Sequence, residues 1–367
     1  MFSENQKISM RQTFRLFSYD LIGMSTLLLP TFLADYAGCD GIFAIFIGTL
    51  AALCYVTYLN WVIRGMGNDL LTYCKEAVPV LMEKLVLVWL LFQAVIVAGY
   101  TAYVFANLMN KSLLKEETFW LVLIVSLAIA GYGIIGEMEG RARIYEVLFW
   151  FILIPLVLML ISAGKEVDTD YWTPIFTSDI WSTAQASYLV FIFFGTVSWM
   201  LLMSGYVKKE DREHRLARSI KCAVIFAAVV LASLYLLLLG TFGNGALANM
   251  DYPAVTFMST VQITGGFLKR ADALMQGVWF FTLFALLNTN LFYGMTVLKE
   301  FVGLKGKKRY MLILLAATFA VAALFYLSKE CGRLFIGYWR YAGMPLLILV
   351  PGSLLLFGRK HNKGGAK

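Results

Sequence analysis

This sequence has little charge and few cysteines, and both shortages exclude whole classes of protein. Charged residues make up 15% of its 367 residues, against roughly 25% in ordinary soluble domains, while 60% are hydrophobic. So few charges cannot cover a water-exposed surface, which argues against a soluble enzyme and against a nucleic-acid binder. The five cysteines are scattered and form no C-x-x-C pair, so we expect neither a metal site nor a disulfide framework.

The sequence also lacks the motifs of catalysis. It contains no phosphate loop, no zinc-ligand spacing, no nucleophile elbow and no paired catalytic acids. We therefore expect no enzymatic activity, no catalytic residue and no cofactor.

The chain is instead rich in apolar runs that are long enough to cross a bilayer, which takes about 20 helical residues. Ten such stretches lie near residues 12–36, 41–63, 84–109, 118–136, 144–163, 184–206, 219–242, 271–298, 310–327 and 336–357. The sequence therefore predicts an all-α polytopic membrane protein with ten transmembrane helices, forming a single transporter-like domain over residues 1–367.

The distribution of positive charge predicts the orientation. When each Lys or Arg is assigned to its nearest loop or terminus, 23 of the 31 lie on the side of the N-terminus and 8 on the other side. Cytoplasmic loops carry the excess of Lys and Arg in membrane proteins. Both termini, including a tail at residues 358–367, are therefore expected to be cytoplasmic.

Ten spans divide into two halves of five, about residues 8–163 and 184–357. A repeat with an odd number of spans must insert its second copy upside down, as in inverted-repeat transporters. In such proteins the first helix of each half is often discontinuous near the bilayer midplane. We therefore predict a 5+5 inverted repeat with discontinuous helices one and six.

Small and hydroxyl residues lie at matching depths in spans one and six: Gly23, Met24, Ser25 and Thr26 in the first, and Gly195, Thr196 and Ser198 in the second. Glycine disfavours a helix interior, and neighbouring hydroxyls can satisfy backbone groups where a helix unwinds. The alternative is that both glycines only permit close helix packing. The matched positions favour unwinding.

Two breaks would present free N–H groups to a shared cavity, which suits the carboxylate of a small amino-acid-like ligand. We therefore predict that the small residues of both breaks bind this ligand. Tyr100, Tyr103 and Asn288 could complete the pocket. Ordinary packing is the competing interpretation for these three residues.

Charged residues near the predicted cytoplasmic ends of spans one and five suggest a gate. Asp20 lies inside a span, where an acid needs a cavity or a partner. We expect Asp20 to pair with Arg15 or another cation. Glu139, Arg143 and Glu146 are spaced as helical neighbours and could form a similar network, although a role in topology or packing is the alternative.

Several motifs together resemble the GerAB-like spore permease family, which comprises the B subunits of spore-germinant receptors. They are Ile8-Ser9-x-x-Gln12 followed by Gly23 and Pro30; Ala37-Gly38-Cys39-Asp40-Gly41; Glu139, Arg143 and Glu146 in an E-x3-R-x2-E element; Asp251-Tyr252-Pro253; and Gly266 to Ala273. The third and fourth lie in loops, and a short helix after Pro253 could cap the pocket.

The resemblance implies a ten-helix fold like that of bacterial amino acid transporters of the amino acid/polyamine/organocation (APC) superfamily. It also implies a germinant-sensing subunit that recognises a small nutrient, such as an amino acid, and assembles with an A-type membrane subunit and a C-type lipoprotein. The expected location is the bacterial inner membrane of the cell or spore. An amino acid permease, with or without proton coupling, is the alternative function, and a ligand-gated water or ion conduit is a third.

Overall fold

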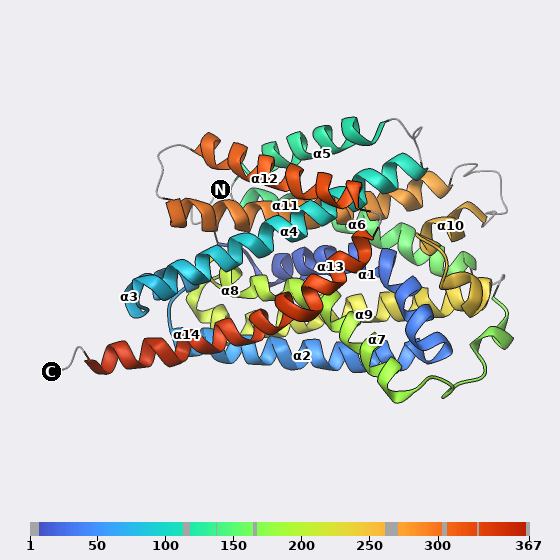
Figure 1. The fold of residues 1–367 in the computed structure, drawn as a ribbon, viewed down its shortest axis with the longest axis horizontal. Coiled ribbons are helices and arrows are strands. Elements are labelled where there is room, and N and C mark those ends of the chain that lie inside the picture. The colour runs from blue at the N-terminus through green and yellow to red at the C-terminus, as the bar shows by residue number, and fades with distance from the viewer. Residues whose placement is uncertain are drawn as a thin grey trace.

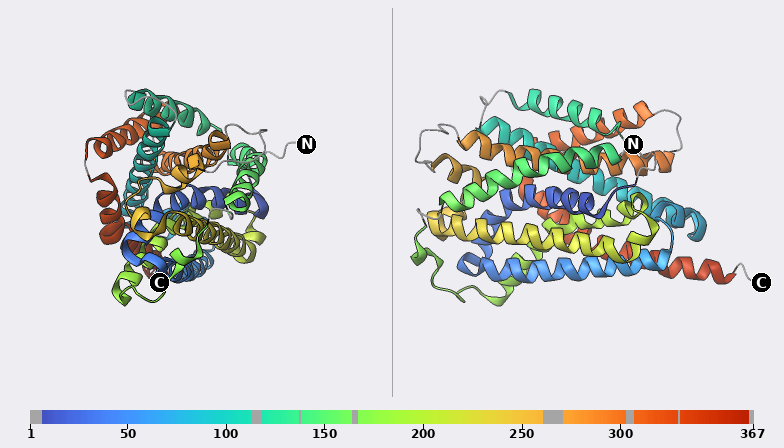
Figure 2. Two further views of the ribbon diagram at one scale, coloured as in Figure 1. Left: turned by 90° about the vertical axis from the view of Figure 1, so that its right-hand side faces the viewer. Right: turned by 180° about the vertical axis from the view of Figure 1, so that it is seen from behind.

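The fold is an elongated bundle of helices that run roughly along one long axis (Figures 1 and 2). The computed structural model describes residues 7–364 apart from 113–117, 137, 164–166, 261–270, 303–306 and 329. The motif residues Gly266 to Arg270 and the last three residues of the predicted tail lie outside these described ranges. The last turns of α14 lie at the end of the bundle that carries α3, and α10 lies at the opposite end (Figure 1).

Helices account for nearly all of the described chain, and the described ranges contain no β-strand. The elements are α1 (Met10–Ala37), η1 (Gly38–Asp40), α2 (Gly41–Met66), α3 (Leu70–Ala77), α4 (Val80–Ser112), α5 (Phe119–Gly133), α6 (Met138–Ala163), η3 (Thr169–Trp172), α7 (Ile180–Phe193), η4 (Phe194–Trp199), α8 (Met200–Met203), η5 (Ser204–Tyr206), α9 (Lys209–Leu247), α10 (Pro253–Thr260), α11 (Ala271–Val302), α12 (Lys307–Leu327), α13 (Cys331–Tyr338), η6 (Trp339–Gly343) and α14 (Met344–Gly364).

These helices confirm a polytopic membrane protein. Within the described residues, seven helical stretches are long and apolar enough to cross a membrane, or eight if the bent pair α5 and α6 counts as one span. One of the seven, Met10–Met66, contains both α1 and α2. Each of the ten predicted apolar stretches is largely helical. That each of them crosses the membrane separately remains a prediction.

Helix α1 lies in the middle of the bundle. It packs against α9, α11, α7 and α6 (Figure 2), and every residue from Leu16 to Pro30 is buried. A helix that is buried all round its circumference needs neighbours on every side. The position of α1 therefore decides where the other long helices can lie.

The predicted break in the first helix is wrong, because α1 is continuous through Gly23. The Ser25 and Thr26 hydroxyls donate to the carbonyls of Leu21 and Ile22 inside the same helix. Gly23 instead permits close contact with Thr282 of α11. Small residues at membrane helix interfaces allow this kind of approach, which explains the glycine without any unwinding.

The sixth predicted span does change its geometry at the predicted place. Helix α7 ends at Phe193, and the tighter 3-10 segment η4 follows over Phe194–Trp199. This segment contains Gly195, Thr196 and Ser198, and it continues directly into α8. A 3-10 stretch inside a span is a local tightening of the helix. Of the two predicted breaks, only the one in the sixth span corresponds to a change of helix geometry.

The Ala37 to Gly41 motif forms the corner between α1 and α2. Gly38 has a positive φ of 51°, which favours glycine. The Tyr235 hydroxyl donates to the Gly38 carbonyl, and Gly41 leaves room for the tyrosine ring. The Asp40 carboxylate accepts bonds from the backbone N–H and the hydroxyl of Ser178, at 2.8 and 2.7 Å. The motif therefore fixes the corner and the loop before α7.

Replacing Gly23 with alanine tests the close contact between α1 and α11. An ideal Cβ at residue 23 would lie 2.8 Å from the Thr282 Cβ and 3.0 Å from its backbone carbonyl carbon. Because the backbone of a packed helix cannot easily retreat, we expect Gly23→Ala to lower the free energy of unfolding by about 1–3 kcal/mol. Thermal unfolding of the purified protein in detergent measures this loss.

Gly195→Ala is the matched control, since an ideal Cβ there would meet its nearest atoms at an ordinary 3.5 Å. We expect its midpoint of thermal unfolding to stay close to that of the unchanged protein. Equal effects of the two substitutions would contradict a tight contact at Gly23.

Candidate functional site

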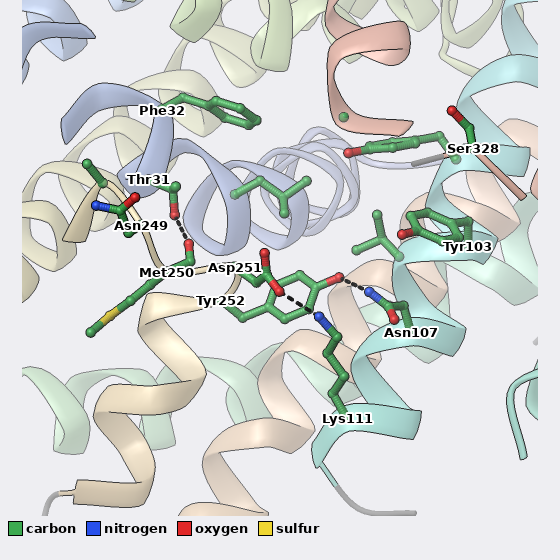
Figure 3. Close-up of a pocket in the computed structure, with 15 residues that line it drawn as sticks. Thr31, Phe32, Tyr103, Asn107, Lys111, Asn249, Met250, Asp251, Tyr252 and Ser328 are labelled. Atoms are coloured by element: carbon green, nitrogen blue, oxygen red, sulfur yellow. Dashed lines mark hydrogen bonds and ion pairs between the residues drawn. The ribbon is translucent and has the colours of Figure 1, made fainter. Parts of the chain in front are cut away.

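The candidate ligand site is a cavity of about 510 Å³ near α10, here called the α10 cavity (Figure 3). It lies between α1, α4, the loop before α10 and the start of α13. Its lining residues are Leu28, Thr31, Phe32, Tyr100, Tyr103, Val104, Asn107, Lys111, Ala248, Asn249, Met250, Asp251, Tyr252, Ser328 and Gly332. This volume lies in the range typical of small-molecule sites, about 300–1,000 Å³.

The loop before α10 closes one side of the α10 cavity and is held from two helices (Figure 3). From α1, the Thr31 hydroxyl donates to the Met250 carbonyl at 2.6 Å. From α4, the Asn107 amide donates to the Tyr252 hydroxyl at 2.8 Å. The Asp251-Tyr252-Pro253 motif thus lies in the wall of the cavity, and α10 begins at Pro253 as the sequence suggested.

Tyr100 and Tyr103 are the two predicted ligand residues that line this cavity. Their ring centroids lie 6.1 Å apart, as expected for positions three apart on a helix. Tyr100 also stacks on Phe335 of α13 at 3.8 Å between centroids. The aromatic side of the cavity is therefore formed by tyrosines of α4, and α13 packs against it.

The other predicted ligand residues do not line the α10 cavity and pack between helices. The Ser198 hydroxyl accepts a bond from the Gln93 amide at 3.0 Å, and Thr26 accepts one from Trp279 at 3.1 Å. The Asn288 amide donates to the carbonyl of Ala130. The remaining members of this group are Gly23, Met24, Ser25, Gly195 and Thr196. The hydrogen bonds of Ser198, Thr26 and Asn288 join neighbouring helices, as expected if these residues serve in helix packing.

Asp20, which lies nearer the start of α1 than the cavity residues do, belongs to a buried polar group. The Asp20 carboxylate accepts a bond from the Thr289 hydroxyl of α11 at 2.7 Å, and the Arg141 guanidinium of α6 donates to the same hydroxyl. Asp20 is 5% exposed and Arg141 is 6% exposed. The cation associated with Asp20 is therefore Arg141, which acts through Thr289, and Arg15 does not take this place.

Arg141 is the functional candidate that the sequence did not reveal. Its guanidinium lies 5.4 Å from the ring centroid of Tyr145 and 5.6 Å from that of Phe292. Its Nε and Nη1 atoms have no hydrogen-bond acceptor within the described residues. A buried arginine is costly unless it is paired, so Arg141 is a candidate functional residue.

Two of the remaining gate residues, Arg15 and Glu146, belong to a second network, which is centred on Glu146. Its carboxylate pairs with Arg15 at 3.0 Å and with Arg11 at 3.3 Å, and it accepts a bond from the Gln12 amide at 3.1 Å. These contacts join the first family motif on α1 to the E-x3-R-x2-E element on α6. Gln12 also completes a capping box with Ser9 at the start of α1.

Glu139 and Arg143 form an ion pair of their own within α6. Positions four apart on a helix are neighbours, as the spacing indicated. In the part of the chain that the structure describes, no group of three or more His, Cys, Asp or Glu side chains could hold a metal ion.

The comparisons with known proteins identify the family. The family model described as spore germination protein matches residues 7–330. This chain belongs to that family. Spore germination protein B2 of Bacillus subtilis (strain 168) is 20% identical over 354 residues, which cover 95% of this chain and 94% of that protein. Spore germination protein YndE of the same strain is 20% identical over 292 residues, 78% of each chain.

The resemblance to spore permeases is thereby confirmed. The match to the spore germination protein family starts beside the capping box of α1 and extends past α12. It therefore contains the Glu146 network, the Asp20 group and nearly all of the α10 cavity.

Removing the Arg141 guanidinium tests the buried group. Arg141→Met leaves the Asp20 carboxylate buried without its cation, and breaking a buried pair in this way costs about 3–5 kcal/mol. We therefore expect a strongly lowered unfolding temperature in detergent. The double variant Asp20→Asn/Arg141→Met removes both charges, and it should recover part of that loss.

Arg143→Met is the matched control, because its ion pair with Glu139 is partly exposed and such pairs contribute about 0–1 kcal/mol. We expect a small effect. A double variant no more stable than Arg141→Met would refute the coupling of Asp20 to Arg141.

Proposed function

We propose that the protein is the membrane-embedded, nutrient-sensing subunit of a spore germination receptor. Its ligand is a small amino-acid-like nutrient. The single observation that carries this proposal, beside the family, is the α10 cavity, which combines an aromatic side with one positive and one negative side chain, Lys111 and Asp251. An amino acid carries both charges, so this lining suits it. No catalytic step and no cofactor enter the proposal.

The ten helical stretches form a 5+5 inverted repeat, with repeats at about residues 8–163 and 184–357, in a plan like that of the APC superfamily. The α3 end of the bundle faces the cytoplasm, and the α10 end faces away from it. The excess of Lys and Arg on the side of the chain ends supports this orientation. The nutrient then reaches the α10 cavity from the side opposite the cytoplasm.

The ligand residues in this proposal are those of the α10 cavity, with Tyr100 and Tyr103 kept from the sequence prediction. An unbroken α1 offers no free N–H groups at Gly23, so that part of the predicted site is not carried forward. Ser198 and Asn288 instead position the helices that surround the cavity.

Helix α1 connects the cavity to the gate. Thr31 contacts the loop before α10, Asp20 joins the buried group, and Arg15 pairs with Glu146. A ligand that binds one arrangement of this loop more tightly shifts the balance between arrangements of α1. Asp20, Arg15, Glu139, Arg143 and Glu146 then act as gate or coupling residues.

The proposed partners are an A-type membrane subunit and a C-type lipoprotein in the bacterial inner membrane of the cell or spore. Large apolar side chains remain exposed on the outside of the bundle, among them Phe46 at 71% and Phe151 at 66%. Lipid tails and the partner's transmembrane segments can both cover such a surface.

An amino acid permease is the second candidate, and the Asp20 group favours it. Ionisable residues inside membrane helices mark ion and proton pathways as well as structural pairs. In that case the Asp20 carboxylate would couple proton movement to uptake.

Binding and uptake by the full-length protein in liposomes separate the two candidates. Each standard amino acid is offered first in a binding assay and then in an uptake assay with an imposed pH gradient. We expect saturable binding of at least one amino acid, without accumulation inside the liposomes. The readouts are the dissociation constant and the amount of radiolabelled amino acid retained.

Accumulation driven by the gradient and abolished in Asp20→Asn would favour the permease over the sensor. Absence of binding by any amino acid would overturn the proposed ligand class.

A further inference from the structure

Among the described residues that line the α10 cavity, Lys111 of α4 and Asp251 of the loop before α10 form an ion pair (Figure 3). The Lys111 side chain is 50% exposed and the Asp251 side chain is 75% exposed. Exposed pairs of this kind contribute little to stability because both ions keep much of their hydration. The pair can therefore open at small cost.

Two hydrogen bonds hold the loop before α10 independently of this pair. The Thr31 hydroxyl holds the Met250 carbonyl, and the Asn107 amide holds the Tyr252 hydroxyl. Asn107 and Lys111 are four residues apart on α4 and therefore lie on the same face. When the ion pair opens, the loop remains attached to both helices, and the ammonium and the carboxylate remain at the cavity.

The cavity becomes apolar along α4 away from the pair. Tyr103 and Val104 lie about two helical turns before Lys111, and Phe32 and Leu28 of α1 line the cavity with them. A ligand with its charged end at Lys111 and Asp251 would direct an apolar or aromatic side chain toward these residues. Aromatic rings bury large areas of such side chains, which gives this end of the cavity its preference.

We propose that the Lys111–Asp251 ion pair is the recognition element for a zwitterionic amino acid with an apolar or aromatic side chain. The α-carboxylate of the ligand binds the Lys111 ammonium, and its α-ammonium binds the Asp251 carboxylate, so the ligand takes the place of each residue's present partner. This inference rests on the proposed function and names the ligand class and its orientation in the same cavity.

The exchange replaces one exposed pair by two charge-assisted contacts in a partly enclosed cavity, and such contacts are stronger than neutral hydrogen bonds. A ligand with only one of the two charges makes one new contact and leaves the other residue without its partner. Recognition therefore requires both charged groups of the ligand. Lys111 binds the carboxylate, and Asp251 binds the ammonium.

The test uses the full-length protein in nanodiscs and the amino acid that binds most tightly among the twenty standard ones. The probes are this amino acid, its methyl ester, which lacks the carboxylate, and its N-acetyl form, which lacks the ammonium. Dissociation constants are measured for the unchanged protein, Lys111→Gln and Asp251→Asn. The exposed pair Arg333–Glu330 belongs to the same end of the bundle but not to the cavity lining, and Arg333→Gln and Glu330→Gln are the matched controls.

We expect each of the two cavity variants to bind the free amino acid about tenfold or more weakly, and the control variants to bind it as the unchanged protein does. Lys111→Gln should not weaken the methyl ester further, and Asp251→Asn should not weaken the N-acetyl form further. This crossed pattern would support the proposal, because a general loss of folding weakens every probe alike.

If the free amino acid bound both cavity variants as tightly as the unchanged protein, the proposal would be overturned while the sensing function stood. Equal weakening of all three probes by Lys111→Gln would also overturn it. If no amino acid bound the unchanged protein, both this inference and the proposed ligand class would fail.

Discussion

The structure depends on keeping a carboxylate and a guanidinium together inside a bundle that otherwise buries apolar side chains. Asp20 belongs to α1 and Arg141 to α6, and the Thr289 hydroxyl of α11 joins them. In a low-dielectric interior an unpaired charge is costly, so separating these three helices would leave a buried charge without its partner. This contact holds the middle of α1, and the contacts at both ends of α1 are placed relative to it.

The family motifs lie mainly at the two ends of this central helix. At one end, Gln12 and Arg15 meet Glu146 of α6, and at the other, Thr31 holds the loop before α10. Helix α1 is continuous between these two sets of contacts, and it contains Pro30 one residue before Thr31. In the proposed sensing function, a shift at the α10 cavity would reach Glu146 through α1, which carries Asp20 between these two sets of contacts.

Much of the fold could be predicted from the sequence, because apolar windows and helical spacing are local properties. Tyr100 and Tyr103 are in contact for a similarly local reason, because they lie three residues apart on one helix. The break at Gly23 was mispredicted because a glycine that unwinds a helix and one that permits close packing look alike until Thr282 is placed beside it. Arg141 was missed because it counted as a loop cation, whereas α6 begins at Met138 and carries it into the bundle.

The central claim is that the nutrient is recognised in the α10 cavity beside an unbroken α1. An experimental structure of the protein with its tightest-binding amino acid is the most direct test. The account predicts ligand density between Tyr103 and Tyr252, with the helical hydrogen bonds of α1 intact through Gly23. Ligand density against an opened backbone at Gly23 to Thr26, with the α10 cavity unoccupied in the same structure, would contradict it.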